Sequence, residues 1–317
     1  MKLFTKRLFL PSFVLIVIWL FIAPAYTQQR LNSCRPQIVL PPHATTAAIG
    51  IARECNDPKK QVVTRSQALQ QLAKADVVYL GETHDSAKDH QNQLEIVEQL
   101  YRRNKKIAIA LEMFQRPYQG IIDDYLAGKI SEQQLLAKTE YEQRWGFPWE
   151  YYAPIVQFAK AKKLPVLALN TPTEITRKVA KSGLESLSPE ERKYIPPFTE
   201  IRTDNAEYRQ LLLKIFQQHQ ADANGSSPSF ERFFLAQVLW DETMAEGIAN
   251  FLTAKPNYQV VVLVGQGHIV YNYGIPSRVA RRINRRLFSQ SSVLLSSPQN
   301  EQTNINTPIA DFIWLDN

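Results

Sequence analysis

The stretch that decides the fold is residues 76–85, which read DVVYLGETHD. Its first half is a short, continuous apolar run rich in β-branched and aromatic residues, which is typical of a strand buried on both faces of a parallel sheet. Its second half turns at once to glycine, acid and histidine. Because ligands collect where the chain leaves the carboxyl ends of parallel strands, this stretch predicts a polar site directly after a buried strand.

Three further segments share this short, continuous apolar character. They are 107–111 (IAIAL), 164–169 (LPVLAL) and 259–264 (QVVVLV). Together with residues 76–80 they make four predicted strands. Helical periodicity lies between them, at residues 86–104, 149–163 and 230–253. The alternation predicts an α/β fold, with a mainly parallel sheet flanked by helices.

The rest of the chain is expected to complete one large α/β domain, residues 65–317. Helical insertions near 113–148 and 172–228 are predicted to lie over the carboxyl ends of the strands. Two later apolar runs, 291–295 and 309–315, are expected to add edge strands. Amino-terminal helix caps are predicted at Ser66, Ser131 and Ser229.

Residues 1–25 are typical of a secretory signal peptide. A basic start precedes an apolar run of 16 residues, 8–23, and the segment ends in Ala-Pro-Ala. A membrane-spanning helix needs about 20 apolar residues, so cleavage after Ala25 is favoured over an uncleaved anchor. The mature protein is therefore expected in the periplasm or outside the cell, with peripheral membrane contact at most.

The exported amino-terminal segment, residues 26–64, contains both cysteines of the chain, Cys34 and Cys55. In an oxidising compartment we expect them to form a disulfide. A loop of roughly 20 residues would contribute about 3 kcal/mol in the chain-entropy model. The sequence Leu-Asn-Ser-Cys that ends at Cys34 loosely resembles a lipoprotein cleavage site, so a lipid anchor on that cysteine is the weaker alternative.

The net charge gives little reason to expect a nucleic-acid partner. Residues 1–25 carry three of the 37 basic residues and no acid, so 34 basic and 30 acidic residues leave +4 for the rest of the chain. The densest basic cluster has helical spacing near the end of a predicted helix. Its members are Arg278, Arg281, Arg282, Arg285 and Arg286. We interpret it as a solvated face that complements the helix dipole, rather than a patch for an anionic partner.

All four predicted strands end in polar side chains. Glu82 and His84 follow the first strand, Glu112 the second, Asn170 the third and His268 the fourth. Burying an unpaired charge is costly, so four such ends together indicate a shared pocket rather than separate loop residues. Two imidazoles beside carboxylates suit proton transfer or metal binding, and the sequence leaves open which metal, if any, is bound.

The motifs Gly-Glu-Thr-His at 81–84 and Gly-Gln-Gly-His at 265–268 resemble the paired motifs of the Tiki and erythromycin-esterase superfamily. Three longer stretches are similar to its ChaN-like haem-binding branch. They read WGFPWEYYAPIVQFAKAKKLPVLALNTP, LAQVLWDETMAEGI and GQGHIVYNYGIPSRV. The resemblance covers roughly residues 70–285 and is more specific than any one motif. It implies that the working groups are Glu82, His84, Glu112 and His268.

The resemblance implies haem or a related iron tetrapyrrole as the ligand, and iron or haem acquisition as the process. Haem proteins draw the axial ligand from His, Tyr, Met or Cys, and Tyr271 and Tyr273 are the preferred oxygen ligands here. Other expected contacts are His84, Asn170, Asp241, Met244 and His268. Five aromatic side chains are expected either to form the walls of the haem slot or to pack as part of an ordinary insertion on the sheet. They are Trp145, Phe147, Trp149, Tyr151 and Tyr152. A homodimer could cover both faces of so flat a ligand.

The predicted helix at 230–253 carries a second set of candidates. Trp240 and Met244 recur at helical spacing, which is typical of a stripe facing the core. Asp241 lies beside that stripe and needs a partner if it is buried, for which His268 and Arg116 are the candidates. Trp240 stands where the esterase branch has arginine, which favours binding over esterase chemistry.

The alternative function is a hydrolase, in which Glu82 and His84, or a divalent metal, activate water while His268 orients or ligates. A scaffold without chemistry is the third hypothesis. The chain contains no Gly-x-Ser-x-Gly, phosphate loop or dinucleotide fingerprint, which excludes the common serine hydrolases and nucleotide enzymes. It also lacks Cys-x-x-Cys-His, so covalent haem attachment is excluded.

Overall fold

The computed structural model describes residues 37–41, 62–221, 229–296 and 308–316. The predicted signal peptide and the pair Cys34 and Cys55 lie outside these ranges, so export, the disulfide and the lipid anchor stay predictions. Within the described ranges, no helix is both long and apolar enough to cross a membrane.

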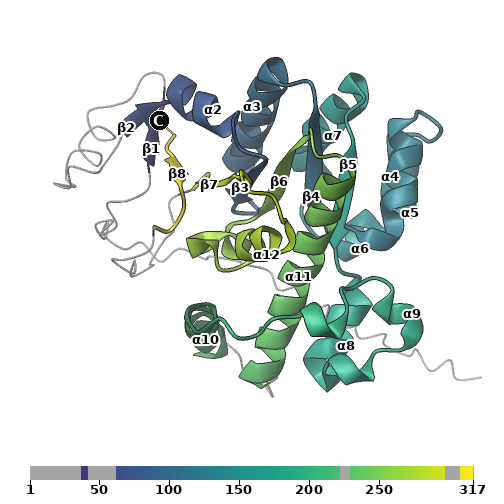
Figure 1. Cartoon of the computed structure of the whole chain (residues 1–317). Coiled ribbons are helices and arrows are strands. Elements are labelled where there is room, and N and C mark those ends of the chain that lie inside the picture. Colours follow the sequence, from purple (N-terminus) through teal and green to yellow (C-terminus); the bar gives the residue numbers. More distant parts are fainter. Residues whose placement is uncertain (1–36, 42–61, 222–228, 297–307, 317) are drawn as a thin grey trace, which may run out of the picture.

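In the described part of the chain, eight strands form one sheet in the order β2-β1-β8-β7-β3-β6-β4-β5 (Figure 1). Every neighbouring pair is parallel. The strands are β1 (Gln37–Leu40), β2 (Val62–Thr64), β3 (Val77–Glu82), β4 (Ile107–Gln115), β5 (Val166–Asn170), β6 (Gln259–Gly265), β7 (Gln290–Leu294) and β8 (Phe312–Trp314). The predicted α/β class is confirmed.

The four apolar runs of the sequence form β3, β4, β5 and β6, and two details differ from expectation. β4 continues past Leu111 to Gln115, with a register shift between these residues, so the first insertion begins only at residue 116. β7 and β8 form as predicted but are not at an edge, because β1 and β2 extend the sheet beyond them. These two short strands come from the segment 26–64 and were not predicted.

One face of the sheet is covered by α2 (Arg65–Leu72), α3 (Ala87–Arg103) and α7 (Trp149–Lys162). Val78 and Leu80 of β3 pack in the apolar cluster on this side. Successive side chains of an extended strand point to opposite faces, so their neighbours along β3 face the other way.

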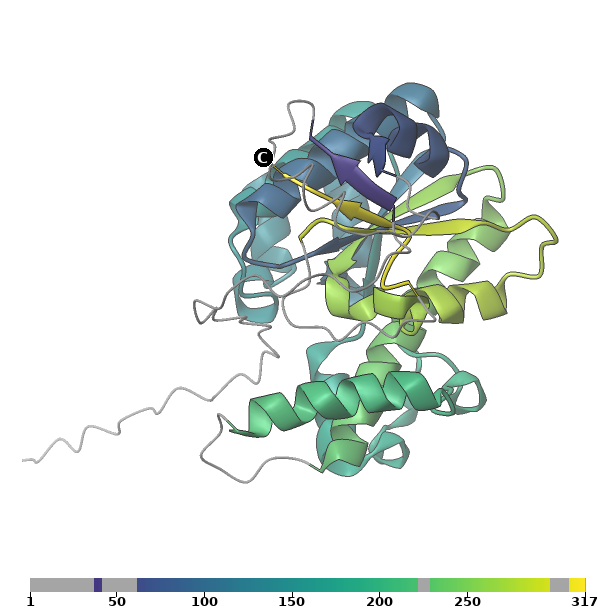
Figure 2. The ribbon, with the colours of Figure 1, turned by 90° about the vertical axis from the view of Figure 1, so that its left-hand side faces the viewer.

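The opposite face is covered by α11 (Phe230–Ala254) and α12 (Ile275–Arg282). Val77 and Tyr79 of β3 pack in the apolar cluster on this side. Sheet and helices therefore form three layers, with the sheet in the middle (Figure 2). Because both faces are covered, the central strands are continuously apolar and turn polar only at their carboxyl ends.

The two insertions pack differently. The first consists of η1 (Arg116–Tyr118), α4 (Gln119–Leu126), α5 (Glu132–Lys138) and α6 (Tyr141–Arg144) and joins the core on the α7 side. The second consists of α8 (Thr173–Ser182), η2 (Leu184–Ser186), α9 (Pro189–Arg192), η3 (Phe198–Glu200) and α10 (Ala206–Ala221). It packs on the first half of α11 in two small apolar clusters, below the sheet in Figure 1.

One of the three predicted helix caps forms as expected. The Ser131 side chain accepts a hydrogen bond from the backbone of Gln134 in a capping box. Ser229 is an N-cap without a side-chain hydrogen bond. Ser66 is not a cap, because Thr64, two residues earlier, makes the capping box of α2 with Gln67.

Candidate functional site

The polar strand ends meet at the carboxyl edge of the sheet, together with one carboxylate from α11. Glu82 ends β3, Glu112 lies in β4, and His268 closes the short turn η4 (Gln266–His268) after β6. We call the group the acid–histidine cluster. Its members are Asp241, His268, Glu112, His84 and Glu82, and all five side chains are buried. Three of the four predicted strand ends therefore come together, and Asn170 at the end of β5 is not part of the cluster.

His268 lies between two carboxylates. Its Nδ1 is 2.6 Å from Asp241 Oδ1, and its Nε2 is 3.3 Å from Glu112 Oε1. Burial lowers the pKa of His268, but the negative charge of Glu112 and the hydrogen bond to Asp241 outweigh it and raise the pKa to about 10. The ring is therefore an imidazolium at neutral pH, and both of its nitrogens are engaged.

Asp241 takes His268 as its partner, as one of the two candidates predicted. Its second oxygen accepts a short hydrogen bond from the Tyr208 hydroxyl on α10. The other candidate, Arg116, pairs instead with Glu246 at 2.6 Å. Tyr208 was missed by sequence reasoning, because it lies in a polar insertion 33 residues before the acid it contacts.

Glu112 links the two histidines. Its Oε2 accepts the Gly265 backbone N–H at 2.7 Å, while Oε1 faces His268. Burial raises the pKa of Glu112, but the charge and hydrogen bond of His268, followed by the charge of His84, lower it overall to about 2. The group is therefore a carboxylate at any pH near neutral.

His84 occupies the same kind of position at the other end of the cluster. Its Nδ1 lies 2.8 Å from Glu82 Oε1. Burial lowers the pKa of His84, but the Glu82 hydrogen bond and the charge of Glu112 raise it overall. A Cβ on Gly265 would lie 2.8 Å from His84 Nε2, so this close approach requires glycine at the end of β6.

Glu82 is held by Tyr152, which was predicted only as an aromatic wall, and by two groups of α3 that were not predicted. The Tyr152 hydroxyl donates to Oε1 at 2.7 Å, and the Gln93 amide donates to Oε2 at 2.5 Å. His90 lies 3.6 Å from Oε2. Burial raises the pKa of Glu82, but the His84 hydrogen bond and the charges of His90 and His84 lower it overall. His90 and Gln93 were detectable, since they lie three apart on the helix that follows the first motif.

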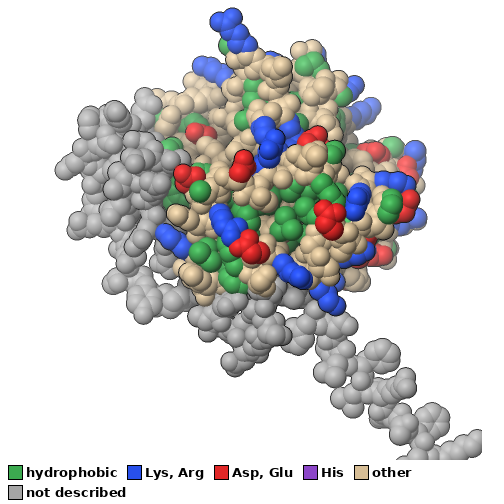
Figure 3. Space-filling model, turned by 60° about the horizontal axis from the view of Figure 1, so that its bottom comes forward, with side chains coloured by type: hydrophobic (Ala, Val, Ile, Leu, Met, Phe, Trp, Pro, Cys, Tyr) green, Lys and Arg blue, Asp and Glu red, His purple; other side chains and the backbone are tan. Residues whose placement is uncertain are grey.

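The cluster is thus a row in which three carboxylates alternate with two imidazole rings. Within the described residues, no group of three or more His, Cys, Asp and Glu side chains is placed to hold a metal ion. No histidine is visible on the face drawn in Figure 3, where acidic and basic side chains surround apolar patches. The arrangement can hold or move protons inside the protein.

The predicted aromatic walls lie against the histidines. Trp145 and Phe147 pack on His84, with ring centroids 5.0 and 4.9 Å apart, and Tyr151 stacks on His90 at 5.0 Å. Partial exposure is seen for Phe147, Trp149 and Tyr151, whereas Trp145 and Tyr152 are buried. The buried rings close over His84, and the partly exposed rings give the group an apolar edge at the surface.

Two other predicted contacts have different outcomes. Met244 is fully buried in the apolar cluster between α11 and the sheet, which confirms its predicted role as a core residue, and its contact with a cofactor stays a prediction. Asn170 ends β5 and is half-buried, and its side-chain oxygen has no hydrogen-bond partner among the described residues. The Asn170 oxygen is therefore available to a ligand at the carboxyl edge.

The turn after His268 holds both predicted tyrosine ligands. Tyr271 and Asn272 have left-handed φ angles of 56° and 58°, a conformation that is uncommon for non-glycine residues. The Tyr271 and Tyr273 rings stack at 5.4 Å, and Arg278 donates to the Tyr273 carbonyl at 2.6 Å. Tyr271 is buried, whereas Tyr273 is half-buried and lies 6.5 Å from the Tyr208 ring. We call residues 271–273 the tyrosine turn.

The arginine cluster differs from the solvated face that was predicted. Arg278, Arg281 and Arg282 converge on Glu242, a fully buried carboxylate on α11. Only 5% and 9% of the Arg278 and Arg282 side chains are exposed. The interpretation is wrong for Arg278 and Arg282, because a buried carboxylate needs cationic partners, and no sequence pattern marks Glu242 as buried. Arg281 also pairs with Glu242 but remains exposed.

Comparison with known proteins identifies the family. The family model described as haem-binding uptake, Tiki superfamily, ChaN matches residues 68–279. The chain belongs to this family. The family match agrees with the resemblance carried by the two Gly-x-x-His motifs, both of which lie within the matched residues.

A solved ChaN structure shares the fold. A Campylobacter jejuni ChaN structure, described as showing cofacial haem binding, aligns with a TM-score of 0.62 at 19% identity, over 80% of this chain and 92% of that one. An erythromycin esterase mutant in its open conformation aligns with a TM-score of 0.43 at 14% identity, over 73% and 72% of the two chains. At such identities the likeness to the ChaN structure shows the fold alone.

A curated relative is RETICULATA-RELATED 5, a chloroplastic protein of Arabidopsis thaliana. It is 27% identical over 293 residues, which cover 86% of this chain but 38% of the relative. The chain therefore spans little more than a third of the length of that protein.

Proposed function

We propose that this protein is an exported haem-binding protein that serves iron or haem acquisition. Membership of the haem-binding uptake family supports the ligand class. The observation that carries the proposal for this chain is the tyrosine turn, in which two stacked phenol rings follow His268 on a backbone held in an uncommon conformation. Strain of this kind persists where the surrounding structure and a function maintain it.

The residues at this end of the sheet fit haem whose iron is bound by a tyrosine oxygen rather than by a histidine nitrogen. Both nitrogens of His268 face carboxylates, and His84 is bonded to Glu82 and pressed against Gly265. An imidazolium has no lone pair for iron, whereas a phenolate oxygen is an established axial ligand. Tyr273 is half-buried and thus the leading candidate. Bound haem would supply an iron with an axial position for this oxygen.

The partly exposed aromatic rings offer a second element of a haem site. Phe147 packs on His84 and Tyr151 stacks on His90, and both rings are partly exposed and present an apolar edge. A flat tetrapyrrole gains from burial of this kind. A second copy of the chain covering the other haem face would complete the burial, so we expect haemin to promote dimers, which size-exclusion chromatography with and without haemin would detect.

Export is supported by the leader-like sequence of residues 1–25. The expected mature start is Tyr26. Amino-terminal sequencing of the exported protein tests this expectation. A lipid-modified start at Cys34 would replace a free exported protein with a membrane-anchored one.

The central experiment is an absorbance titration of the mature protein with haemin. Tyr273→Phe removes the ligand oxygen and keeps the ring, so we expect a changed Soret band and weaker binding. Tyr271→Phe tests the second oxygen of the tyrosine turn, and Tyr258→Phe, just before β6 and at the opposite end of the sheet, is the matched control. Unaltered spectra and affinity for both Tyr271→Phe and Tyr273→Phe would refute tyrosine ligation, and no binding by the wild type would refute the proposal.

A specific observation favours a Glu/His-dependent hydrolase as the second candidate. Asp241 orients His268 as the carboxylate of a catalytic dyad would, at 2.6 Å from Nδ1. The test compares ester and peptide hydrolysis by the wild type with that by the His84→Ala, His268→Ala double variant, with and without zinc or manganese. Loss of a catalytic base typically lowers turnover by about 10² or more. We expect no turnover above the double variant, and turnover that needs both histidines would favour the hydrolase.

A further inference from the structure

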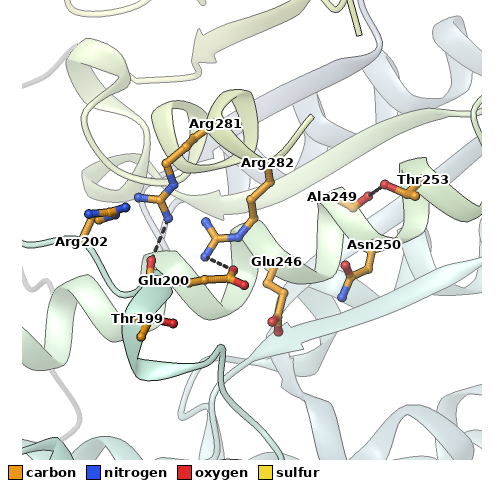
Figure 4. A pocket seen from close by; sticks show the side chains of 9 residues that line it. All are labelled: Thr199, Glu200, Arg202, Glu246, Ala249, Asn250, Thr253, Arg281 and Arg282. Atoms are coloured by element: carbon orange, nitrogen blue, oxygen red, sulfur yellow. Dashed lines mark hydrogen bonds and ion pairs between the residues drawn. The ribbon is translucent and has the colours of Figure 1, made fainter. Parts of the chain in front are cut away.

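A pocket lies on α11, apart from the acid–histidine cluster. It has a volume of about 420 Å³ and is lined by residues of α11, the last turn of α12 and the segment Thr199–Arg202 around η3. Figure 4 shows Arg281 and Arg282 reaching from α12 toward Glu200, with Glu246 and Asn250 of α11 beside them. A pocket of this size can hold a small molecule.

The surroundings of this pocket carry an excess of positive charge. Arg278, Arg281 and Arg282 share the single carboxylate of Glu242, which also accepts the backbone N–H of Arg202. One charge therefore balances three. Two more cations, Arg116 and Arg202, and two more anions, Glu246 and Glu200, lie around the pocket. The total is five cations and three anions, which is an excess of two positive charges.

Arg282 is the buried side chain that points to a ligand. Its Nη1 is 2.6 Å from Glu242, but its Nε and Nη2 have no hydrogen-bond partner among the described residues. Nη2 is 3.5 Å from Glu200 Oε2, without the geometry of a hydrogen bond. With 9% of the side chain exposed, bulk water cannot readily satisfy these donors. An unsatisfied buried donor on a charged group is costly and is normally completed by a ligand or water.

Arg202 supplies a second available cation. Its side chain lines the pocket and is exposed, and among the described residues it has no hydrogen-bond or ion-pair partner. Guanidinium groups bind phosphate and carboxylate oxygens in a bidentate manner. Two acids also line the pocket, but Glu246 is paired with Arg116 at 2.6 Å and Glu200 is half exposed toward solvent.

We propose that this pocket binds a small molecule bearing a phosphate dianion, with Arg282 and Arg202 as the principal donors. The dianion matches the excess of two positive charges. The volume exceeds what a phosphate group alone requires, so the ligand is an ester whose remaining part lies along Asn250 and Thr253 of α11. This site is independent of haem binding.

The test is isothermal titration of the mature wild-type protein with glycerol 3-phosphate and with inorganic phosphate, in a phosphate-free buffer at fixed ionic strength. Arg202→Gln removes an exposed donor and should leave the fold intact. Loss of one charge-assisted contact is expected to weaken binding by about tenfold or more. Asn250→Glu adds a negative charge to the opposite wall and should weaken binding at least as much. Arg102→Gln, an exposed arginine on α3, is the matched control and should bind as the wild type does.

Tighter binding of the ester than of inorganic phosphate supports the proposal, and so does binding that is lost in Arg202→Gln and Asn250→Glu but kept in Arg102→Gln. Absence of binding at millimolar concentrations overturns it. Equal binding by all three variants overturns it too, because the anion would then sit elsewhere. Titration with succinate tests whether phosphate itself is recognised. If succinate bound as tightly as the ester, the pocket would bind dianions in general, which would contradict the stated ligand class.

Discussion

His84 and His268 occupy matching positions in the acid–histidine cluster but have different surroundings. Each ring lies between two carboxylates and shares Glu112 with the other. Around His84, the aromatic rings of the first insertion fill the space. Around His268, polar groups of α10 and α11 form the second layer, with Tyr208 bonded to Asp241.

The two histidines at this sheet edge are therefore restrained by different kinds of interaction. Aromatic rings restrict His84 sterically, and it depends on the glycine at position 265 for space. Hydrogen bonds restrict His268, and its charge depends on Asp241 and Glu112. Adding side-chain volume next to the cluster should therefore perturb His84 more than His268. Removing a charge from the cluster should perturb His268 more than His84.

The largest effect is expected from Asp241→Asn. Asparagine offers one acceptor oxygen where Asp241 serves both His268 and Tyr208, so one buried donor loses its partner and the imidazolium loses a counter-charge. Breaking a buried ion pair from one side typically costs ~3–5 kcal/mol. Urea denaturation measures the loss, and Asp85→Asn, an exposed acid on the β3–α3 loop, should change stability by less than ~0.5 kcal/mol. A cost for Asp241→Asn as small as that of the control would contradict the charge-dependent account of His268.

A smaller effect is expected from Gly265→Ala. The added methyl group would lie 2.8 Å from His84 Nε2, so the ring must move away from position 265, at a cost of ~1–3 kcal/mol for overpacking. The His84 resonances should shift in NMR spectra, while those of His268 shift less. Gly120→Ala in α4 is the control, since its Cβ meets nothing within 4 Å. Unchanged His84 resonances in Gly265→Ala would show that the ring is not held by the glycine contact.

The stability should also depend on pH through two neighbouring members of the row, His268 and Glu112. The pKa of His268 is raised to about 10, so its contribution is complete below about pH 6.5 and is lost as the pH rises through 10. The pKa of Glu112 is lowered to about 2, so its contribution is complete above about pH 4.5 and is lost as the pH falls toward 2.

These two contributions predict a maximum of stability between about pH 4.5 and 6.5. Above it, the wild type should lose up to ~1.4 kcal/mol per pH unit, and His268→Gln should lose less, because it has no proton to release. Denaturant titrations at pH 5.5, 7 and 8.5 measure the slope. Equal slopes for the two proteins would show that His268 is not the source of this pH dependence of stability.

Much of this site could be predicted because strand ends are local features. The apolar runs fix where β3, β4 and β6 stop, and parallel strands bring their carboxyl ends together, which placed Glu82, His84, Glu112 and His268 in one site. The partnership of Asp241 with His268 also followed, since a buried carboxylate needs a cation.

The rest depends on long-range packing that single segments do not encode. Tyr208 reaches Asp241 only because the second insertion packs on α11. Glu242 is buried only because α12 and the η3 segment cover it, so the arginines around it could not be distinguished from a solvated face. β1 and β2 are too short to predict, with four and three residues, and form by pairing with β8 and each other.

The central claim is that His268 is held as an imidazolium ion within the acid–histidine cluster and is therefore not an iron ligand, whereas the tyrosine turn supplies one. NMR of ¹⁵N-histidine-labelled protein measures the protonation of each ring directly, with His84→Gln and His268→Gln used for assignment. At pH 7.5 the account predicts two protonated nitrogens on His268 and no titration of this ring below about pH 9, in keeping with its pKa of about 10. A neutral His268 with one bare nitrogen at pH 7.5 would contradict the account and make that histidine an available ligand.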